Sequence, residues 1–367
     1  MTVSRTFDTL KHLLLSVAVL SPLLMAFPSW SQLFGQIANP EYVPADWGLP
    51  DTAVDSDQVP SMKIDPKASV DRPLPVYRIA SDTYMFLGNI STLNEDNRGW
   101  NGNAGFIVTS EGVVVIDTLG TPKLGRRVIA TIRSLTDKPV RYLIITHNHP
   151  DHSYGAEAFA SIDGVTIIAH KGSIQYNQSE TLDSSVDYRR ELLPEDMKDF
   201  KPVAADNYID AETFTSYRIE LGDAVFDIYN TGKHHSHGDL IVHQRKQDVV
   251  WISDLAFNQR TTFLGDGHSE QIILAQDWLM DNFSKAKLMV PGHGSAQTAP
   301  FPMVSKTRDY VQRLRDAMEK AVDDGVGIYD AVREVEFSDW KDTYLYQENH
   351  KANANFIYLE MEQALFE

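Results

Sequence analysis

The sequence predicts an α/β protein in which two β-sheets pack against each other with helices on their outer sides. Short β-branched or aromatic segments, bounded by Gly, Asn or Asp, alternate with stretches of helical periodicity. The strand-like segments form two successive clusters, separated by a polar stretch at residues 176–215. Because each sheet must bury an apolar face, we expect the two clusters to form one layered structure.

The expected elements follow this order along the chain. Strands are predicted at residues 84–87, 104–108, 113–116, 142–145, 165–168, 217–219, 225–228, 240–242, 249–252 and 288–290. Helices are predicted at residues 122–135, 154–160 and 270–282, and from about residue 303 to the end. In the first helix Pro122 suits the opening turn, and Leu124, Val128 and Ile132 recur at helical spacing. The segment 176–215 is long enough to be a lid or a helical insertion.

The N-terminus has the pattern of a secretory signal peptide. Arg5 and Lys11 precede an apolar stretch at residues 13–27, which is followed by the small residues Ser29 and Ser31. We therefore expect residues 1–31 to be removed and the mature protein to be periplasmic or secreted. An uncleaved membrane anchor is the alternative, but two prolines interrupt a run that is short for a bilayer span.

The remaining chain divides into three predicted parts. Residues 32–75 are rich in Pro, Asp and Ser, which indicates an extended leader packed over the domain, or a linker. Residues 76–300 contain all the predicted strands and form the expected catalytic domain. Residues 301–367 are expected to be a helical C-terminal extension.

Composition limits the chemistry and the partners. The net charge is −18, so nucleic acid is a poor partner and a small-molecule substrate is expected. The chain has no Cys, which excludes disulfides, thiolate metal ligands and cysteine nucleophiles. Any metal ion must therefore be bound by imidazole and carboxylate groups.

A run of potential metal ligands follows the predicted strand at residues 142–145. His147 and His149 are two residues apart on an extended segment, so both can face one ion. Asp151 and His152 lie where the chain turns into the next helix and can face a second ion. An isolated buried His is usually only a hydrogen-bonded core residue, but four such side chains within six positions indicate a metal site.

Further candidate ligands follow three other predicted strands. The segment 232–239 contains three histidines, Asp254 follows the strand at 249–252, and His293 follows the strand at 288–290. Each of these is weak evidence alone, because a polar residue in a Gly-flanked loop is usually a surface residue. Together they supply the three extra ligands that two ions require.

These motifs, in this order over roughly residues 80–300, resemble the metallo-β-lactamase superfamily of binuclear hydrolases. The resemblance implies an αβ/βα four-layer sandwich with the site at one edge and two Zn²⁺ ions per chain, with other divalent metals as alternatives. It implies that the first ion is bound by His147, His149 and His235, that the second is bound by Asp151, His152 and His293, and that Asp254 bridges the two. Asp117 resembles the strand-end Asp that supports the metal-binding loop.

The resemblance also assigns the histidines of the segment 232–239. His235 stands three residues before Gly238, as the family pattern requires. His234 and His237 are then expected beside the ligands or facing the substrate.

Asp254 narrows the class within the superfamily. The thiolate-ligated β-lactamases have Cys at this position, whereas a bridging Asp resembles glyoxalase II-type thioesterases, lactonases, organophosphate hydrolases and sulfatases. Residues 348–353, before a terminal helix, resemble exported members associated with quinoprotein or sulfur-oxidation systems.

The expected mechanism is hydrolysis by a hydroxide shared between two metal ions. The bond would be ester-like: a thioester, lactone, β-lactam, phosphoester or sulfate ester. Asp151 or Asp254 is expected to manage the proton. Arg260 is the expected contact for an anionic substrate, whereas Arg189 and Arg190 are expected to be solvated surface charges.

Two other classes are compatible with the motifs. One is a non-haem iron oxidoreductase on the same fold, similar to persulfide dioxygenases, because two histidines and a carboxylate can bind Fe(II). The other is a zinc-binding module without catalysis. A complete set of seven ligands favours the hydrolase over both.

Overall fold

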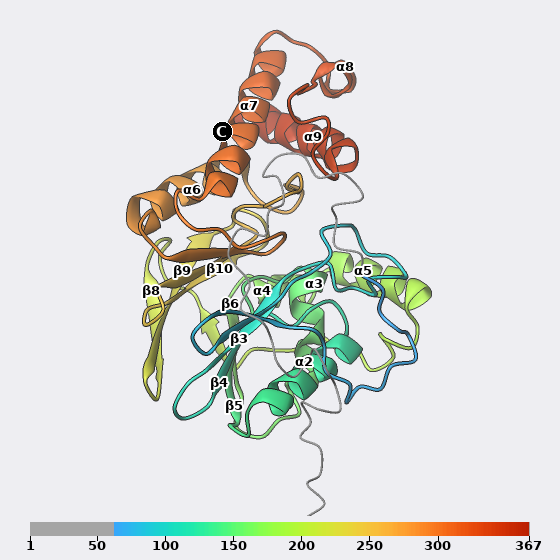
Figure 1. The fold of residues 1–367 in the computed structure, drawn as a ribbon. Coiled ribbons are helices and arrows are strands. Elements are labelled where there is room, and N and C mark those ends of the chain that lie inside the picture. The colour runs from blue at the N-terminus through green and yellow to red at the C-terminus, as the bar shows by residue number, and fades with distance from the viewer. Residues whose placement is uncertain (1–61, 367) are drawn as a thin grey trace, which may run out of the picture.

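The chain folds into two sheets packed between outer helices. This computed structural model describes residues 62–366. The predicted signal peptide and the first part of the predicted leader therefore lie outside the described residues. Figure 1 shows helix α2 beside the strands of the first sheet and helix α6 above the second sheet, with the C-terminal helices at the top. The predicted four-layer αβ/βα sandwich with a helical C-terminal part is confirmed.

The first sheet has seven strands in the order of the chain. They are β1 (Tyr77–Ala80), β2 (Thr83–Phe86), β3 (Ala104–Val108), β4 (Val113–Ile116), β5 (Val140–Ile144), β6 (Thr166–His170) and β7 (Asn207–Ile209). The pairings from β1 to β4 are antiparallel, and those from β4 to β7 are parallel. The parallel strands therefore bring the loops after β4, β5 and β6 to one edge.

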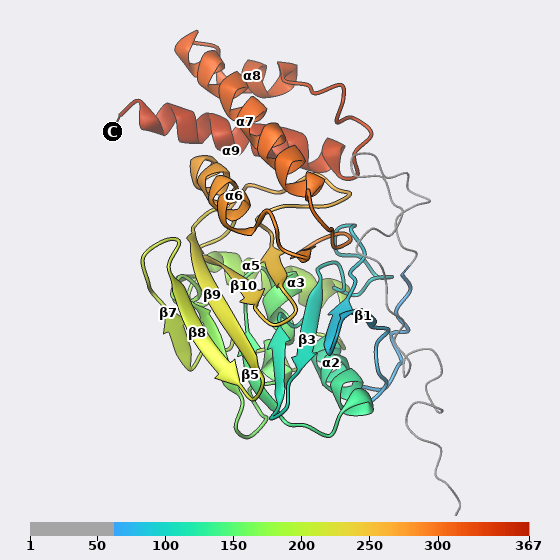
Figure 2. The ribbon, with the colours of Figure 1, turned by 60° about the vertical axis from the view of Figure 1, so that its left-hand side comes forward.

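The second sheet has five strands, in the order β12-β11-β10-β9-β8. They are β8 (Ser216–Leu221), β9 (Ala224–Gly232), β10 (Asp239–Gln244), β11 (Val249–Ser253) and β12 (Leu288–Pro291). Only β11 and β12 pair in parallel, so both end at the same edge of this sheet. Figure 2 shows β8, β9 and β10 beside the strands of the first sheet.

The helices lie outside the sheets or in the connections. Those in the first half are α2 (Pro122–Leu135), α3 (Pro150–Ser153), the 3₁₀ helix η3 (Tyr154–Ala158), α4 (Ser173–Tyr176) and α5 (Glu180–Leu192). Those in the second half are α6 (Ser269–Phe283), α7 (Pro302–Asp323), α8 (Ile328–Glu334) and α9 (Tyr346–Ala364). Among residues 62–366, no helix is long and apolar enough to cross a membrane.

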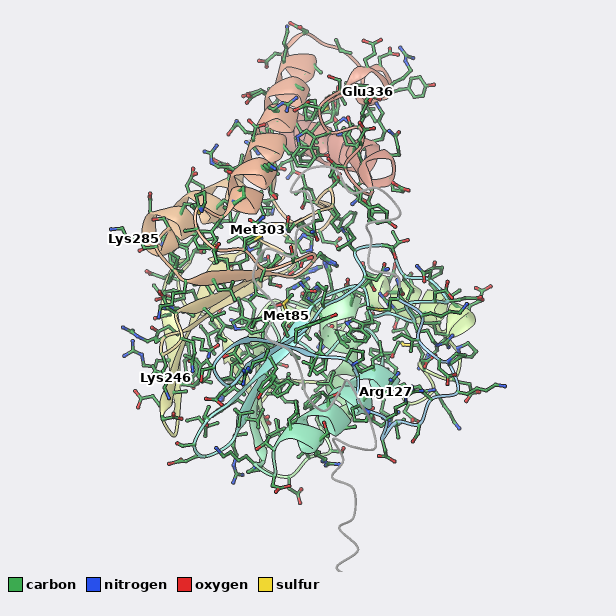
Figure 3. All side chains as sticks on the ribbon, viewed as in Figure 1. Met85, Arg127, Lys246, Lys285, Met303 and Glu336 are labelled. Carbon is green, nitrogen blue, oxygen red and sulfur yellow. The ribbon has the colours of Figure 1, made fainter. Side chains whose placement is uncertain are left out.

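Strand alternation separates the core into layers. In β4, Val114 and Ile116 pack between the two sheets, whereas Val113 and Val115 face the layer that contains α2. This follows from the two-residue period of a strand whose two faces are both covered. Figure 3 shows Met85 in this interior and Lys246 and Lys285 projecting outward.

The C-terminal helices extend the core of the second sheet. Val250 of β11, Ile272 of α6, Leu314 of α7 and Ile357 of α9 belong to one continuous cluster of buried side chains. Figures 1 and 2 both show α7 and α9 stacked beyond α6. These helices are therefore packed on the sandwich through a shared core.

The structure differs from the predicted elements in three places. Strands β1 and β7 are short edge strands that the sequence pattern did not reveal. The helix predicted at residues 154–160 is instead the 3₁₀ helix η3, preceded by the short α3. Its tight course is set by Gly155, where a Cβ would lie 2.0 Å from the Thr118 carbonyl oxygen.

Part of the predicted leader packs on the domain. Leu74 is fully buried, and its backbone N–H donates to Thr131 Oγ1 of α2 over 2.7 Å. Arg127, also on α2, donates to the Arg72 carbonyl oxygen. Residues 72–74 of this segment are therefore anchored on α2.

Candidate metal centre

Four connections bring the predicted ligands together at one edge of the sandwich. His147 to His152 follow β5 in the first sheet. His235 lies between β9 and β10, Asp254 follows β11 directly, and His293 follows β12. Since these strand ends meet at one edge, residues far apart in the sequence become neighbours.

The seven predicted metal ligands form two compact groups. Within each group, one potential ligand atom from every residue lies within 4.8 Å of those of the others. The first group is His147, His149, His235 and Asp254, and the second is Asp151, His152 and His293. The division matches the two ligand sets that the family resemblance implied.

Each histidine of the two groups has one ring nitrogen fixed by a protein partner. The fixed contacts are His147 Nδ1 with Thr146 Oγ1 (3.1 Å), His149 Nε2 with Asp266 Oδ2 (2.9 Å), His152 Nδ1 with Asp117 Oδ2 (2.9 Å), His235 Nδ1 with the Phe263 carbonyl oxygen (3.0 Å) and His293 Nδ1 with the Asn101 carbonyl oxygen (2.8 Å). Such contacts orient an imidazole and leave its other nitrogen for a metal ion.

Asp254 lies at the centre of both groups. Its Oδ2 is 3.0 Å from His235 Nε2 and 3.4 Å from His293 Nε2, and its Oδ1 is 3.4 Å from His152 Nε2. The carboxylate therefore faces histidines of the first and the second group at the same time. This is the arrangement required of a bridging ligand.

The side chains fit a metal site by the number of donors they leave unused. The Nε2 atoms of His147 and His152 are buried without a hydrogen-bond partner. Buried polar atoms in native proteins are almost always paired, so unpaired atoms that converge indicate a missing partner. Imidazole and carboxylate donors in this number suit Zn²⁺ and similar divalent ions.

The electrostatics of the cluster keep its carboxylates ionised. Burial alone would raise the pKa of Asp254, but His293, His152 and His235 hold it well below its ordinary value. Asp151 behaves in the same way, with a pKa of about 2. Burial, with a contribution from His152, holds the pKa of His147 well below its ordinary range. Asp254 and Asp151 outweigh burial at His152 and raise its pKa to about 10, so metal binding there requires the loss of a proton.

Asp117 fixes the loop that carries the first four ligands. One carboxylate oxygen accepts a hydrogen bond from the Thr146 backbone N–H over 2.8 Å, and the other contacts His152 Nδ1. Asp117 has a φ of +57°, an uncommon value for a residue with a side chain. Close packing continues at Gly292, where a Cβ would lie 1.7 Å from Asp254 Oδ1.

A cleft of about 360 Å³ opens beside the two groups. Its walls come from the segment before β3, from α5, from the loop after Asp254 and from the start of α9. The wall residues outside the metal-binding groups include Thr92, Leu93, Asn101, Tyr176, Thr181, Ser185, Arg189, Phe257, Arg260, Phe263, Asp266 and Asn349. The cleft is thus lined by both halves of the sandwich and by the C-terminal helices.

The three predicted substrate contacts, Arg260, His237 and His234, differ in their position relative to the cleft. Arg260 lines the cleft, with Nη1 3.2 Å from His293 Nδ1. His237 is half-buried beside Tyr176, at 6.0 Å between ring centroids, and its predicted role is untested. His234 does not line the cleft: it is buried behind His235, with Nε2 3.1 Å from Thr231 Oγ1. Of the two alternatives expected for His234, the structure places it beside the predicted ligand His235 and away from the cleft, because Asp239 folds the loop tightly around it.

The expectation that Arg189 is a solvated surface charge is wrong. Its side chain is buried and lines the cleft, whereas Arg190 is exposed as expected. Arg189 lies on the buried face of α5 together with Leu182 and Val186. That seven-residue spacing was visible in the sequence and was the signal that could have separated the two arginines.

Two residues of the site have no clear sequence signal. Asp266 lies between two glycines in a polar loop and fixes His149. Asn101 fixes His293 through its carbonyl oxygen and donates from Nδ2 to Asp151 Oδ2 over 2.6 Å. Only the folded chain brings these residues to their partners, across 117 positions for Asp266 and 192 for Asn101.

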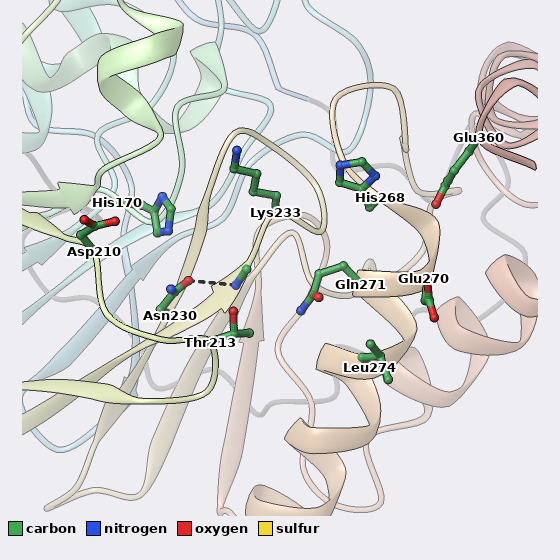
Figure 4. Close-up of a pocket in the computed structure, with 11 residues that line it drawn as sticks. His170, Asp210, Thr213, Asn230, Lys233, His268, Glu270, Gln271, Leu274 and Glu360 are labelled. Carbon is green, nitrogen blue, oxygen red and sulfur yellow. Dashed lines mark hydrogen bonds between the residues drawn. The ribbon is translucent and has the colours of Figure 1, made fainter. Parts of the chain in front are cut away.

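A second cavity, of about 490 Å³, lies on the other side of the segment that carries His235 (Figure 4). His170 and Asp210 are on one side of it, and Glu270 and Gln271 of α6 are on the other. It contains none of the predicted metal ligands.

Comparison with known proteins agrees with the fold. A family described as the metallo-beta-lactamase superfamily matches residues 97–293, which is more than half of the chain. This chain belongs to the metallo-beta-lactamase superfamily.

Two curated relatives represent different enzymes of this superfamily. A linear primary-alkylsulfatase from Pseudomonas sp. (strain ATCC 19151) is 36% identical over 76 residues, which are 21% of this chain and 14% of that protein. A metallo-beta-lactamase type 2 from Elizabethkingia meningoseptica is 26% identical over 218 residues, 58% of this chain and 78% of that protein. The match to the alkylsulfatase therefore spans a small part of its length.

Solved structures show the same fold. The stereoselective inverting sec-alkylsulfatase Pisa1 from Pseudomonas sp. matches with a TM-score of 0.64 and 16% identity, over 86% of this chain and 58% of that chain. A metallo-beta-lactamase from Pontibacter korlensis matches with a TM-score of 0.50 and 20% identity, over 65% of this chain and 98% of that chain.

Proposed function

We propose that this protein is a binuclear zinc hydrolase that cleaves an ester-like bond of a small molecule. The observation that supports this most strongly is the position of Asp254 between two groups of ligands. Two divalent ions bound there would polarise the substrate and supply hydroxide near neutral pH without a protein nucleophile. His147, His149 and His235 would bind one ion, and Asp151, His152 and His293 would bind the other.

The chain itself would orient the substrate and the attacking water. Asp151 lines the cleft, its low pKa keeps it ionised and Asn101 holds its Oδ2, so the carboxylate can accept a hydrogen bond from water at a fixed position. Arg260 carries a positive charge to the same cleft and would stabilise negative charge on the reacting group. The apolar side chains of Leu93, Phe257 and Phe263 would exclude water around the bond.

The buried guanidinium group of Arg260 in the cleft wall favours an ester that carries an anionic group over a neutral ester. The similarity to an alkylsulfatase makes sulfate esters the first substrates to test, and the similarity to β-lactamases makes β-lactams the second. We further propose that the protein is exported to the periplasm or outside the cell. We also propose that the chain consists of a leader, a catalytic domain and a C-terminal extension.

Metal analysis and a hydrolysis screen test this function. We expect protein purified without added metal and then loaded with zinc to hold two ions per chain, measured by plasma mass spectrometry. We expect the loaded protein to hydrolyse at least one of sulfate esters, phosphoesters, thioesters, lactones and β-lactams. One iron per chain as purified would instead support the non-haem iron oxidoreductase, and bound zinc without hydrolysis of any class would support a binding module.

A further inference from the structure

Arg189 is a buried cation with no ion pair. Its side chain is 6% exposed, and among residues 62–366 no carboxylate lies within ion-pairing distance of it. Its Nη1 is buried without a hydrogen-bond partner. The chain has 51 acidic and 33 basic residues, so an unpaired arginine does not reflect a shortage of acidic partners. Burying an unpaired charge destabilises a protein, which indicates that this one has another use.

The surroundings of Arg189 hold its guanidinium group at the cleft. The group lies 5.4 Å from the ring centroid of Tyr154, whose hydroxyl is 3.1 Å from the hydroxyl of Tyr176. Tyr176, Ser185 and Arg189 all line the cleft, and Arg189 is the one charged group of α5 that does so. Burial lowers the pKa of Arg189, and the negative charge of Asp151 acts in the opposite direction.

Arg260 presents a second buried guanidinium to the same cleft. It is 9% exposed, lies 5.5 Å from the ring centroid of Phe257 and has an Nε atom without a partner. Among the described residues it too has no ion pair within bonding distance. Asp151 is the largest favourable charge acting on Arg260, as it is on Arg189. The charge of one carboxylate, Asp151, therefore acts on both arginines, although they come from different parts of the chain.

That carboxylate is not free to serve as their partner. Under the proposed function Asp151 is a metal ligand, so its charge is balanced by the ion. The two guanidinium groups then remain as unbalanced cations in the cleft beside the reaction site. A guanidinium group binds a carboxylate, sulfate or phosphate through paired N–H donors in a fixed plane.

We propose that Arg189 and Arg260 form an anion subsite that binds an oxyanion group of the substrate beside the metal centre. The proposal rests on the proposed function and extends it to a substrate class: molecules with a sulfate, phosphate or carboxylate group. Arg189 comes from the insertion at residues 176–215, so this segment forms a specificity wall of the cleft.

The test is anion binding to zinc-loaded protein, with no turnover needed. Isothermal titration calorimetry with inorganic sulfate, phosphate and acetate would be run on the parent, Arg189→Gln and Arg190→Gln. Arg190 is adjacent in sequence but exposed, so Arg190→Gln is the matched control. We expect the best-bound anion to lose about tenfold or more in affinity in Arg189→Gln, as for a charged hydrogen bond, and less than twofold in Arg190→Gln. The ranking of the three anions identifies the oxyanion.

Zinc content and thermal unfolding of each variant complete the test. Arg189→Gln removes an unpaired buried charge, so we expect it to fold and to lose only the stabilisation that the anion gives the parent. Equal anion affinity in the parent and Arg189→Gln, with two zinc ions in each, would overturn the anion subsite and indicate binding to metal alone. Failure of the parent to hold two ions would instead overturn the proposed function. If Arg189→Gln does not fold, Arg260→Gln provides the same comparison.

Discussion

Two loops meet at the candidate site, and the fold holds them in different ways. The loop from His147 to His152 is fixed from within the sandwich: Asp117, which follows β4, accepts a hydrogen bond from the backbone N–H of Thr146, just before the loop, and contacts the last histidine, His152. The loop from 258 to 264 is fixed from outside by α9. There Asn353 accepts from the Leu264 backbone N–H over 3.0 Å and donates to the Thr262 carbonyl oxygen over 2.9 Å.

The difference suggests a division of tasks within the site. The first loop supplies metal ligands, and Asp117 of the same sheet holds both of its ends, so most of its geometry belongs to the fold itself. The second loop supplies Arg260 and Phe263 to the cleft, and its supports come from the C-terminal helices. The second loop also reaches the first metal-binding group, because the Phe263 carbonyl oxygen fixes His235. Changes in the first loop should therefore alter metal binding, and changes behind the second should alter substrate use.

The largest effect is expected at the residue shared by both metal groups. Asp254→Ala removes the bridging carboxylate and leaves His235, His152 and His293 facing each other without an anion. We expect zinc to fall below two ions per chain and hydrolysis to drop by roughly a thousandfold or more, because both ions and the nucleophile depend on it. Zinc content and kcat/KM would be measured against Asp281→Ala, an exposed aspartate on α6. Retention of two ions and normal activity in Asp254→Ala would contradict the bridging role.

A smaller effect on metal binding is expected from Asp117→Asn. The amide still fills the space, but it weakens the contacts with Thr146 and His152 that orient the metal loop. We expect zinc affinity to fall by about 10- to 100-fold, as for other supporting partners of metal ligands. Competition with a zinc chelator measures it, and unchanged affinity would show that the loop does not need this anchor.

The smallest effect on metal binding is expected from Asn353→Ala. This buried side chain holds the second loop, and its loss leaves the Leu264 N–H and the Thr262 carbonyl without these bonds. We expect unfolding free energy to fall by about 1–3 kcal/mol. Zinc content should stay at two ions while KM rises. Urea unfolding and steady-state kinetics would be compared with Asn355→Ala, on the same helix. Loss of zinc in Asn353→Ala would contradict the proposal that the first loop governs metal binding and the second governs substrate use.

The two loops also differ in how well the sequence predicts them. The ligands of the first loop lie together after an apolar strand, so local spacing was enough to identify them. The apolar strands that end before Asp254 and His293 could be recognised from the sequence in the same way. The pattern of strands also predicted the two-sheet sandwich. Assigning His235 rather than His234 needed the family pattern, since two adjacent histidines look alike until Asp239 folds the loop.

What the sequence did not reveal depends on contacts over long separations or on the direction of a helix face. Asn353 reaches Leu264 across 89 positions, and no local pattern marks either as a partner. Arg189 lies on the apolar face of α5, but an arginine beside a second arginine is usually solvated, and this general expectation outweighed the helical spacing. The cleft wall is therefore the part of the site that required the structure.

The most direct test of the central claim is a crystal structure of the zinc-loaded protein with anomalous scattering recorded at the zinc edge. Two anomalous peaks are expected, one among His147, His149 and His235 and the other among Asp151, His152 and His293, with Asp254 bound to both ions. A single peak, or two peaks with Asp254 bound to neither, would contradict the account of a binuclear centre built around this residue.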